Sequence, residues 1–283
     1  MQIIGVGLGL IGGSMLLGLR HSYPEFQFLG TDASAHHLEE ALRLQIIDRQ
    51  AKQCDFAKAD IVVISIPVDL SAQVIQDTLD KVGEHTLVID TGSTKGNICG
   101  SLSPHPKRDQ FLATHPIAGT EFSGPQAAFS TLFCDKTLII CELEKTRLEL
   151  QQQAINLFEK MQMNIRFMNP KEHDQHIAYV SHLSHISSFM LGKTVIDKER
   201  DEQNIFDLAG SGFESTVRLA KSHPKTWTSI FKDNRVEVRQ ALDHYITNLV
   251  NFKEQLDKEN FDGLYTEMNN TNKLKAILKG IKS

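Results

Sequence analysis

The sequence lacks any apolar run long enough to cross a bilayer. The longest run near the middle spans residues 61–68, whereas a membrane-spanning helix needs about 20 apolar residues. An excess of basic residues is also missing, since 30 Lys and Arg stand against 35 Asp and Glu and the formal net charge is −5. We therefore expect neither a membrane nor a nucleic acid as a partner. The apolar N-terminus lacks the basic segment of a signal peptide, so we expect a cytoplasmic protein.

Cysteine is scarce, and its spacing argues against the common cysteine-based sites. The four cysteines are Cys54, Cys99, Cys134 and Cys141. None of them forms a C-x-x-C pair, so neither a zinc site nor a disulfide framework is indicated. Histidines gather at His173, His176, His182 and His185, but no carboxylate or cysteine completes a recognisable ligand spacing there. We therefore expect no bound metal.

The N-terminal segment, by contrast, is dense in glycine. Gln2–Val6 is predicted to be a short buried strand, and Gly7, Gly9 and Gly12 fit the pattern G-x-G-x-x-G ahead of an apolar helix. In that pattern the first glycine permits a tight turn, the second lets a pyrophosphate approach the main chain, and the third lets the helix pack against the strand. The helix then offers free N–H groups and its positive dipole end to the phosphates. A dinucleotide site is indicated; the alternative is a glycine-rich turn that binds nothing.

An acidic residue after the second apolar run selects the cofactor. Asp32 lies about 20 residues past the last glycine of the pattern, where a carboxylate can hydrogen-bond the ribose 2′-OH. No arginine follows in residues 33–37, so NAD is predicted over NADP. Further contacts are expected where the strand over residues 61–66 ends. The candidate cofactor-binding residues are Gly7, Leu8, Gly9, Leu10, Ile11, Gly12, Asp32, Ser65 and Pro67.

Short apolar runs alternate with helical patterns as far as residue 169. The predicted strands cover residues 2–6, 26–31, 61–66, 86–90, 110–114, 137–141 and 164–168, and the clearest later helices residues 36–44, 70–82 and 147–161. Such alternation is typical of an α/β protein with a doubly wound, Rossmann-type sheet. We predict a dinucleotide-binding domain over residues 1–169.

No convincing strand pattern follows residue 170, so residues 170–283 are predicted to form an all-helical C-terminal domain for substrate binding and dimerisation. Residues 227–256 carry two interleaved apolar sets at seven-residue steps, as in one long helix of about four heptads. The sets are Phe231, Val238, Tyr245 and Phe252, and Leu242, Leu249 and Leu256. Two arrangements fit: a helix within its own chain's bundle, or one shared across a homodimer. We favour the homodimer because so short a segment has little core of its own.

Four stretches carry residues suited to chemistry. They read D-T-G-S-T-K-G from residue 90, H-P-I-A-G-T-E-F-S-G from residue 115, S-H-L-S-H from residue 181 and G-F-E-S-T-V-R from residue 212. With the N-terminal glycines, in this order, they resemble the prephenate dehydrogenase family, which includes the arogenate and cyclohexadienyl dehydrogenases of tyrosine biosynthesis, a branch of aromatic amino acid synthesis. The resemblance covers nearly the whole chain, and the second stretch is its most specific part.

The resemblance implies a reaction: NAD-dependent oxidative decarboxylation of prephenate to 4-hydroxyphenylpyruvate. Hydride leaves the ring carbon that carries the hydroxyl group, and this hydroxyl group must lose a proton to a base. Histidine has a suitable unperturbed pKa for that role. By resemblance the base is His115, and Ser93 would hydrogen-bond both the substrate hydroxyl and this histidine. For Lys95, in the same stretch as Ser93, a simply solvated side chain is the alternative to a role in the site.

The resemblance also implies the residues that hold the substrate. Prephenate is a dicarboxylate, and Arg218 matches the family's arginine, whose guanidinium can grip a carboxylate with two hydrogen bonds. His182 and His185 match histidines beside the pocket, and Glu121 would lie at its edge. Arogenate, with an amino group in place of the keto group, is the alternative substrate. A different two-domain NAD(P) dehydrogenase of the β-hydroxyacid type and a non-enzymatic NAD sensor are the rival readings.

Overall fold

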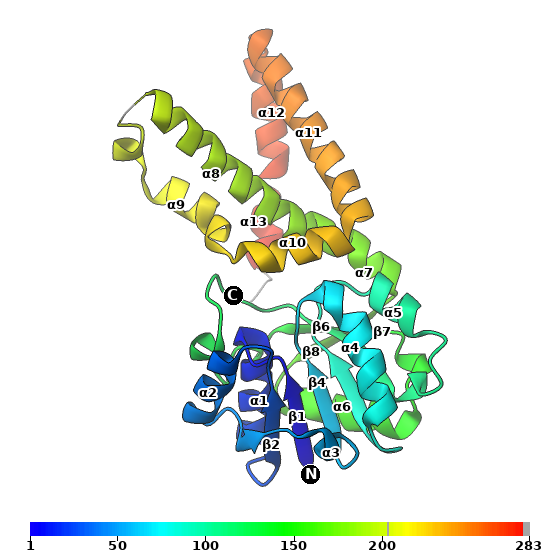
Figure 1. Cartoon of the computed structure of the whole chain (residues 1–283). Helices are drawn as coiled ribbons and strands as arrows, with labels where there is room; N and C mark the ends of the chain where they lie inside the picture. The colour runs from blue at the N-terminus through cyan, green and yellow to red at the C-terminus, as the bar shows by residue number, and fades with distance from the viewer. Residues whose placement is uncertain (203, 280–283) are drawn as a thin grey trace.

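The computed structural model describes residues 1–202 and 204–279, and it divides into a sheet-containing half and a helical half (Figure 1). Within the described residues one eight-stranded sheet has the order β3-β2-β1-β4-β5-β6-β7-β8. The strands are β1 (Gln2–Val6), β2 (Gln27–Thr31), β3 (Arg49–Gln50), β4 (Ile61–Ile64), β5 (Leu87–Asp90), β6 (Phe111–Pro116), β7 (Thr137–Cys141) and β8 (Asn164–Met168). Neighbours run parallel except β6 and β7. The predicted doubly wound sheet is confirmed.

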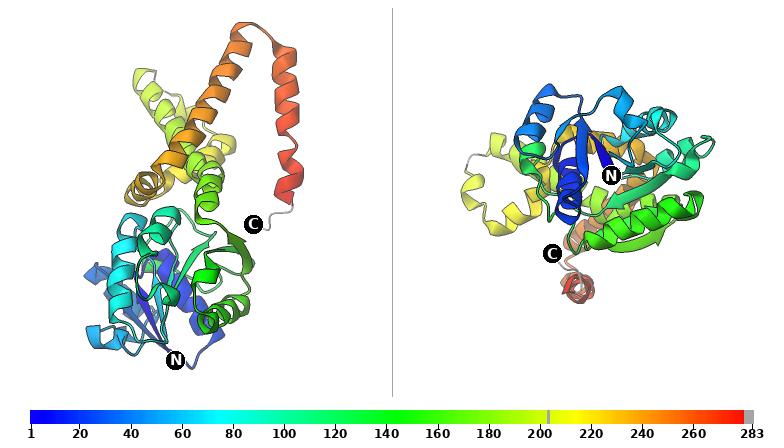
Figure 2. Two further views of the ribbon diagram at one scale, coloured as in Figure 1. Left: turned by 90° about the vertical axis from the view of Figure 1, so that its right-hand side faces the viewer. Right: turned by 90° about the horizontal axis from the view of Figure 1, so that it is seen from below.

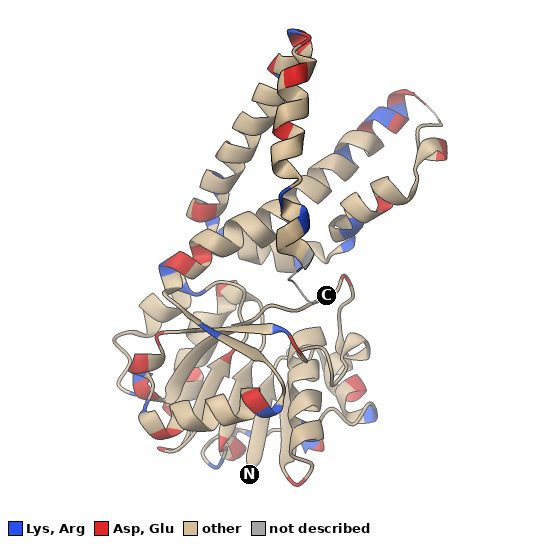
Figure 3. Ribbon diagram, turned by 180° about the vertical axis from the view of Figure 1, so that it is seen from behind, with Lys and Arg blue, Asp and Glu red and all other residues tan. Residues whose placement is uncertain are grey.

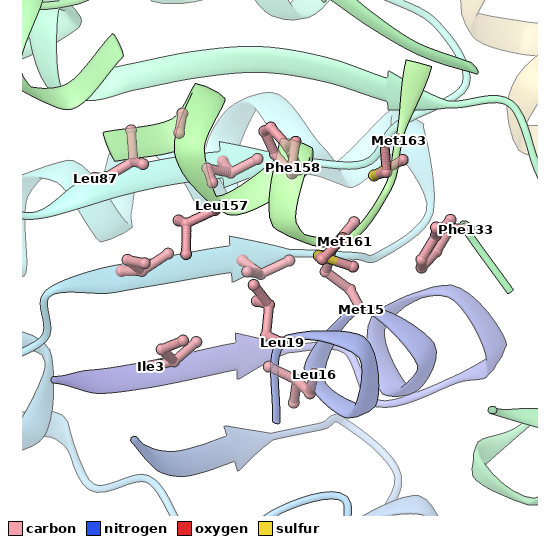
Figure 4. Packing of buried hydrophobic residues seen from close by; sticks show 14 of the residues in the cluster. Ile3, Met15, Leu16, Leu19, Leu87, Phe133, Leu157, Phe158, Met161 and Met163 are labelled. Carbon is pink, nitrogen blue, oxygen red and sulfur yellow. The ribbon is translucent and has the colours of Figure 1, made fainter. Parts of the chain in front are cut away.

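Helices cover both faces of this sheet (Figure 1). They are α1 (Leu10–Ser22), α2 (Ala35–Arg43), α3 (Gln53–Phe56), α4 (Val68–Lys81), α5 (Gly96–Leu102) and α6 (Leu148–Lys160). Because successive strand residues point to opposite faces, Ile3 and Ile4 belong to different apolar clusters, as do Phe28 and Leu29. The first cluster packs against α1 and α6 (Figure 4), and the second against α4 and α5. The sheet-containing half therefore has a complete core.

The helical half begins with α7 (Pro170–Ile177), which continues through a π-helical turn (Ala178–His182) into α8 (Leu183–Asp201). The remaining helices are α9 (Ser211–Val217), α10 (Pro224–Asp233), α11 (Arg235–Asp257), α12 (Phe261–Thr271) and α13 (Leu274–Lys279). Figure 2 shows α11 and α12 as an arm that extends away from the sheet. The division at residues 169 and 170 stays our prediction, and it falls between β8 and α7.

The single long helix that we expected over residues 227–256 is wrong. Helix α10 ends at Asp233 and α11 begins at Arg235. The break follows from Asn234, which is buried and donates from Nδ2 to the main-chain oxygen of Asp174 at 2.8 Å. This contact fixes Asn234 at the corner, so the apolar positions of the seam lie on two separate helices.

Smaller differences concern the strands. The two-residue strand β3 was not predicted, because Arg49 and Gln50 form no apolar run. Strand β4 ends at Ile64, two residues earlier than expected, whereas β6 continues to Pro116 and pairs His115 with Ile139 of β7. His115 therefore lies within a strand. None of the helices in residues 1–202 and 204–279 is long and apolar enough to traverse a bilayer.

Candidate active site

The glycine turn between β1 and α1 has the geometry of a phosphate cradle. Gly7 has φ +89°, and a Cβ atom there would lie 2.1 Å from the main-chain oxygen of Ser65. A Cβ atom on Gly12 would lie 2.0 Å from the main-chain oxygen of Gly7. A Cβ atom on Gly9 would meet nothing within 4 Å, so open space lies before the N-terminus of α1. The first turn of α1 holds no acidic residue, which suits a bound anion.

Asp32 closes the far side of this cradle at the end of β2. Its Oδ2 accepts a hydrogen bond from Leu8 N at 2.8 Å, and its Oδ1 accepts one from Ser34 N at 2.8 Å. The carboxylate is thus fixed beside the glycine turn, with lone pairs left for a ribose hydroxyl. Ser65 lies where β4 ends, and its hydroxyl accepts from Thr91 Oγ1 at 2.9 Å. Pro67 is exposed at the start of α4.

His115 lies near the carboxyl end of β6 and is 8% exposed. Its Nδ1 is 2.8 Å from Nε2 of His173, and the two rings meet edge to face. Nδ1 of His173 is in turn 2.8 Å from Oδ1 of Asp174. His173 and Asp174 belong to α7, so these contacts join the helical half to the sheet. Sequence reasoning weighed His173 only as a metal ligand and missed this contact, because no periodicity predicts which strand α7 packs against.

Asp174 also holds the loop after β5. Its Oδ1 accepts from Lys95 N and its Oδ2 from Gly96 N, both at 2.8 Å. Ser93 lies in this loop and is partly exposed. The hydrogen bond that we expected between Ser93 and His115 is absent among the described residues, and His173 occupies the Nδ1 atom of His115 instead.

The alternative that Lys95 is simply solvated is wrong. Its side chain is fully buried, and its Nζ forms an ion pair with Asp90 and donates to the main-chain oxygen of Thr114 at 2.7 Å. Buried charges need such partners. The cation therefore lies beneath the sheet edge that carries His115. Burial, and then the neighbouring His173 and Lys95, hold the pKa of His115 well below its usual range. His115 is therefore neutral near pH 7, as a base must be.

His182 lies in the π-helical turn and is fully buried. Its Nδ1 is 3.2 Å from Nδ2 of Asn234, the amide nitrogen that also donates to Asp174. An amide nitrogen only donates, so Nδ1 of His182 accepts and the ring proton sits on Nε2. Nε2 has no hydrogen-bond partner among the described residues. Burial lowers the pKa of His182 to about 4. It is therefore a neutral, buried donor that has no acceptor within residues 1–202 and 204–279.

His185 follows one turn later and is half-buried. Its ring stacks on Trp227 at a centroid distance of 3.3 Å, and its Nδ1 donates to the main-chain oxygen of Ser181 at 3.0 Å. Burial lowers the pKa of His185, and the nearby Arg218 cation lowers it further. Trp227 also meets the edge of the His182 ring. The S-H-L-S-H stretch is thus held by aromatic packing against α10.

Arg218 and Glu121 connect the two halves at the outer side of this region. An Arg218 guanidinium nitrogen is 3.5 Å from Oε2 of Glu121, which lies in the loop after β6. The Arg218 side chain is 51% exposed. Within the described part of the chain this guanidinium has one long ion-pair contact, so it retains N–H groups that can donate to an anion. The structure joins His115 to His173 and Arg218 to Glu121 where the carboxyl ends of the strands face the helical half, and it shows no such contact for Ser93 among the described residues.

Among the residues that the structure describes, no group of three or more His, Cys, Asp or Glu side chains is arranged to hold a metal ion.

A doubly wound dinucleotide-type sheet joined to a helical half, with a buried neutral histidine between them, defines a two-domain nicotinamide-dependent dehydrogenase. Comparison with known families narrows this class. The nucleotide-binding domain of prephenate dehydrogenase matches residues 16–167, and the dimerization domain of the same enzyme matches residues 169–270. The chain belongs to the prephenate dehydrogenase family.

Individual relatives agree with this assignment. The prephenate dehydrogenase of Bacillus subtilis is 29% identical over 271 residues, which cover 93% of this chain and 72% of the relative. The cyclohexadienyl dehydrogenase of Zymomonas mobilis is 26% identical over 277 residues, covering 97% of this chain and 94% of the relative. The crystal structure of the A. aeolicus prephenate dehydrogenase with hydroxyphenyl propionate and NAD+ is 29% identical, with a TM-score of 0.90 and 98% of each chain covered.

Proposed function

We propose that this chain catalyses the NAD-dependent oxidative decarboxylation of prephenate to 4-hydroxyphenylpyruvate in tyrosine biosynthesis. One observation carries the proposal: a dinucleotide-type glycine turn and the buried, neutral His115 share one edge of one sheet. The prephenate dehydrogenases among its relatives, one of them solved with NAD+, support the same reaction.

His115 serves as the base in this mechanism. Its imidazole accepts the proton of the substrate hydroxyl group, while the ring carbon that bears this group loses hydride. NAD, when bound, supplies the acceptor for that hydride. Breaking the bond to the ring carboxylate then releases CO2 and sends its electron pair into the ring, which becomes aromatic. The phenolate oxygen so formed takes a proton back, so His115 is neutral again at the end. Ser93 orients the substrate hydroxyl group from the loop after β5.

The substrate's carboxylates need cationic or N–H partners. Arg218 provides a guanidinium that can donate two hydrogen bonds to a carboxylate. The unpaired Nε2–H of His182 supplies a buried donor, and His185 borders the same region. Glu121 holds Arg218 at the outer edge of the pocket. In these assignments Arg218 from the helical half and His115 from the sheet contact the same substrate.

The cofactor is held by the first half. The main chain of the turn from Gly7 to Gly12, including Leu8, Leu10 and Ile11, would hold the pyrophosphate at the N-terminus of α1. Asp32 would accept from the ribose hydroxyls and repel a 2′-phosphate. Ser65 and Pro67 would border the bound cofactor where β4 ends.

Arogenate is the second candidate substrate. It carries an ammonium group where prephenate has a keto oxygen, and the Glu121 carboxylate beside Arg218 offers a partner for that charge. The Zymomonas mobilis relative, which covers 97% of this chain, is named a cyclohexadienyl dehydrogenase. We favour prephenate because the Arg218 ion pair already engages Glu121.

We further propose a homodimer in the cytoplasm, where NAD and the charged substrate are dissolved. Large apolar side chains are exposed along α8, α11 and α12, and residues 244–252 of α11 carry no Lys, Arg, Asp or Glu (Figure 3). Exposed apolar patches of this extent mark interfaces. The side chains are Met190, Leu191, Ile196, Ile246, Leu249, Val250, Phe252, Leu256, Phe261, Tyr265 and Met268. The matching domain family is named for dimerization.

A paired assay tests the proposed reaction. The purified protein is given prephenate or arogenate with NAD or NADP, and NADH absorbance and product are followed. We expect the highest kcat/KM with prephenate and NAD. Faster turnover of arogenate would reassign the substrate, and turnover of a β-hydroxyacid alone would overturn the proposal. NAD binding without any turnover would indicate a sensor.

A further inference from the structure

Three side chains form a hydrogen-bonded series from the helical half to the sheet. Asp174 and His173 on α7 are joined at 2.8 Å, and His173 and His115 on β6 are joined at 2.8 Å. Asp174, His173 and His115 are buried, with residue exposures of 8%, 2% and 8%, and the Asp174 side chain alone is 12% exposed. Solvent therefore cannot supply alternative partners to these nitrogens, and the direction of each hydrogen bond is set by the series itself.

The direction is fixed at the Asp174 end. A carboxylate can only accept, and this one already accepts from the main-chain nitrogens of Lys95 and Gly96 at 2.8 Å each. Nδ1 of His173 must therefore be the donor of the third bond. In its neutral form the His173 imidazole carries only this one proton, so its Nε2 then has a free lone pair directed at His115.

The same reasoning passes to the next ring. Since Nε2 of His173 accepts, Nδ1 of His115 must donate, and the remaining nitrogen of neutral His115 carries no proton. We infer that His173 and Asp174 are positioning residues that fix the tautomer of His115, so that its Nε2 is the atom that takes the substrate proton. This inference rests on the proposed function, in which His115 is the base.

A second set of hydrogen bonds from Asp174, through Asn234, gives His182 the opposite tautomer. The main-chain oxygen of Asp174 accepts from Nδ2 of Asn234, and this nitrogen also faces Nδ1 of His182 at 3.2 Å. If the Asn234 amide were reversed, its oxygen would face the oxygen of Asp174 and repel it. His182 therefore keeps its proton on Nε2, whereas His115 and His173 keep theirs on Nδ1. The site therefore contains histidines of both tautomers, which can be compared within one protein.

The charged groups around His115 explain why a fixed tautomer matters. Lys95 from the loop after β5, with its partner Asp90, lies on one side, and His173 and His182 from the helical half lie on the other. The Lys95 cation disfavours a proton on His115. Once the proton reaches Nε2, the Nδ1–H bond to His173 links the new positive charge to the Asp174 carboxylate. The pair thus selects the basic nitrogen and stabilises the protonated ring.

Substituting Asp174→Asn tests the inference in the full-length enzyme. An asparagine cannot accept hydrogen bonds at both positions of the carboxylate. Where its amide nitrogen faces His173, both hydrogen bonds of the series reverse and the His115 proton moves to Nε2. In either orientation the negative charge that stabilises the protonated His115 ring is lost. In a Ser-His-Asp triad the corresponding change lowers kcat about 10⁴-fold through the wrong tautomer, so we expect a loss of about 10²–10⁴-fold in kcat. NAD affinity should change by less than about 3-fold, because Asp174 lies outside the glycine turn. A kcat within about 3-fold of wild type would overturn the inference.

Asp233→Asn is the matched control. Asp233 accepts from Thr94 Oγ1 at 2.6 Å and from Asn97 Nδ2 at 2.9 Å, so it ties the helical half to the same loop and its flank without touching His173. Its kcat should stay within about 3-fold of wild type. An equal loss in both variants would mean that Asp174 acts only by holding the loop, which contradicts a positioning role.

Nitrogen NMR of histidine-labelled wild-type protein reads the tautomers without any turnover. Signals are assigned with His115→Asn and His173→Gln variants. We expect a protonated Nδ1 in His115 and His173 and a protonated Nε2 in His182. A protonated Nε2 in His115 would overturn the inference even if prephenate is oxidised. Failure to oxidise prephenate, together with the expected tautomers, would instead remove the proposed function and leave the hydrogen-bonded series intact.

Discussion

The two halves of the molecule differ in how many of their apolar side chains are buried. The sheet-containing half buries apolar residues on both faces of the sheet, in the two clusters that α1, α6, α4 and α5 cover. The helical half buries a cluster of only Ala178, Val238 and Ala241 among the described residues, and many of its larger apolar side chains are exposed. A core that small cannot stabilise an independent unit.

This difference indicates what each half contributes. The sheet has a finished core and can present a rigid edge to a cofactor, with Asp32 and the glycine turn fixed by main-chain contacts. The helical half supplies side chains to the other half, through His173, Asp174 and Arg218, and leaves an apolar surface exposed. Substitutions where the two halves meet should therefore lower turnover, whereas they should leave NAD binding intact.

The largest effect should come from His115→Asn, which removes the base but leaves the glycine turn intact. We expect kcat to fall about 10²–10⁴-fold, because proton transfer to a positioned base contributes that much. NAD binding, followed by fluorescence titration, should persist. Near-normal turnover would remove His115 as the base.

Arg218→Ala should weaken substrate binding with little change in NAD affinity. A hydrogen bond to a charged group contributes about 1.5–3 kcal/mol to binding. Because Arg218 is half-exposed, we expect no larger contribution from it. KM for prephenate should therefore rise roughly 10- to 150-fold. The control is Arg147→Ala, which removes another partly exposed pair, with Asp109, at the far end of β6. An unchanged KM would place Arg218 outside the pocket.

Leu249→Glu should separate the dimer. Leu249 is 51% exposed on α11, and a carboxylate buried in an apolar interface is disfavoured, so dimer affinity should fall about 10- to 100-fold. Light scattering across a concentration series measures the change. Asn251→Glu is the control. Residue 251 lies about 200° around the helix from residue 249, so it adds the same charge on the other side of α11. A monomeric wild-type protein would contradict the proposed assembly.

Asp32→Asn should change cofactor choice more than activity. Removing the negative charge that repels a 2′-phosphate should raise kcat/KM with NADP relative to NAD by about 10-fold. Asn keeps an oxygen to accept from Leu8 N or Ser34 N, so the turn should stay folded. Steady-state assays with both cofactors provide the comparison, and an unaltered ratio would show that another group sets the preference.

The smallest effect should be that of pH. The pKa of His115 lies well below its usual range, so the base stays deprotonated and active as pH falls from 8 to 6.5. An unburied histidine, with a pKa of about 6.5, would lose half its activity at that pH. The acid limb of kcat/KM should therefore begin below pH 6.5. A midpoint at or above pH 6.5 would contradict the buried, neutral site.

Local patterns predicted local features well. The predicted bounds of β7 and β8 match the structure, as does the strand–turn–helix around the glycines, because period and turn chemistry are encoded nearby. Contacts between distant segments could not be read in this way. The corner at Asn234 and the contact between His115 and His173 depend on how α7 packs against its neighbours, and the buried Lys95 side chain depends on partners in two strands, Asp90 and Thr114.

The hydride's origin tests the central claim most directly. Prephenate carrying deuterium on the ring carbon that bears the hydroxyl group is turned over by the wild-type protein with NAD, and the NADH formed is analysed by mass spectrometry. We expect every NADH to carry that deuterium, with CO2 released in equal amount. NADH without deuterium, or no NADH at all, would contradict a site in which His115 takes the hydroxyl proton while the same carbon gives up hydride.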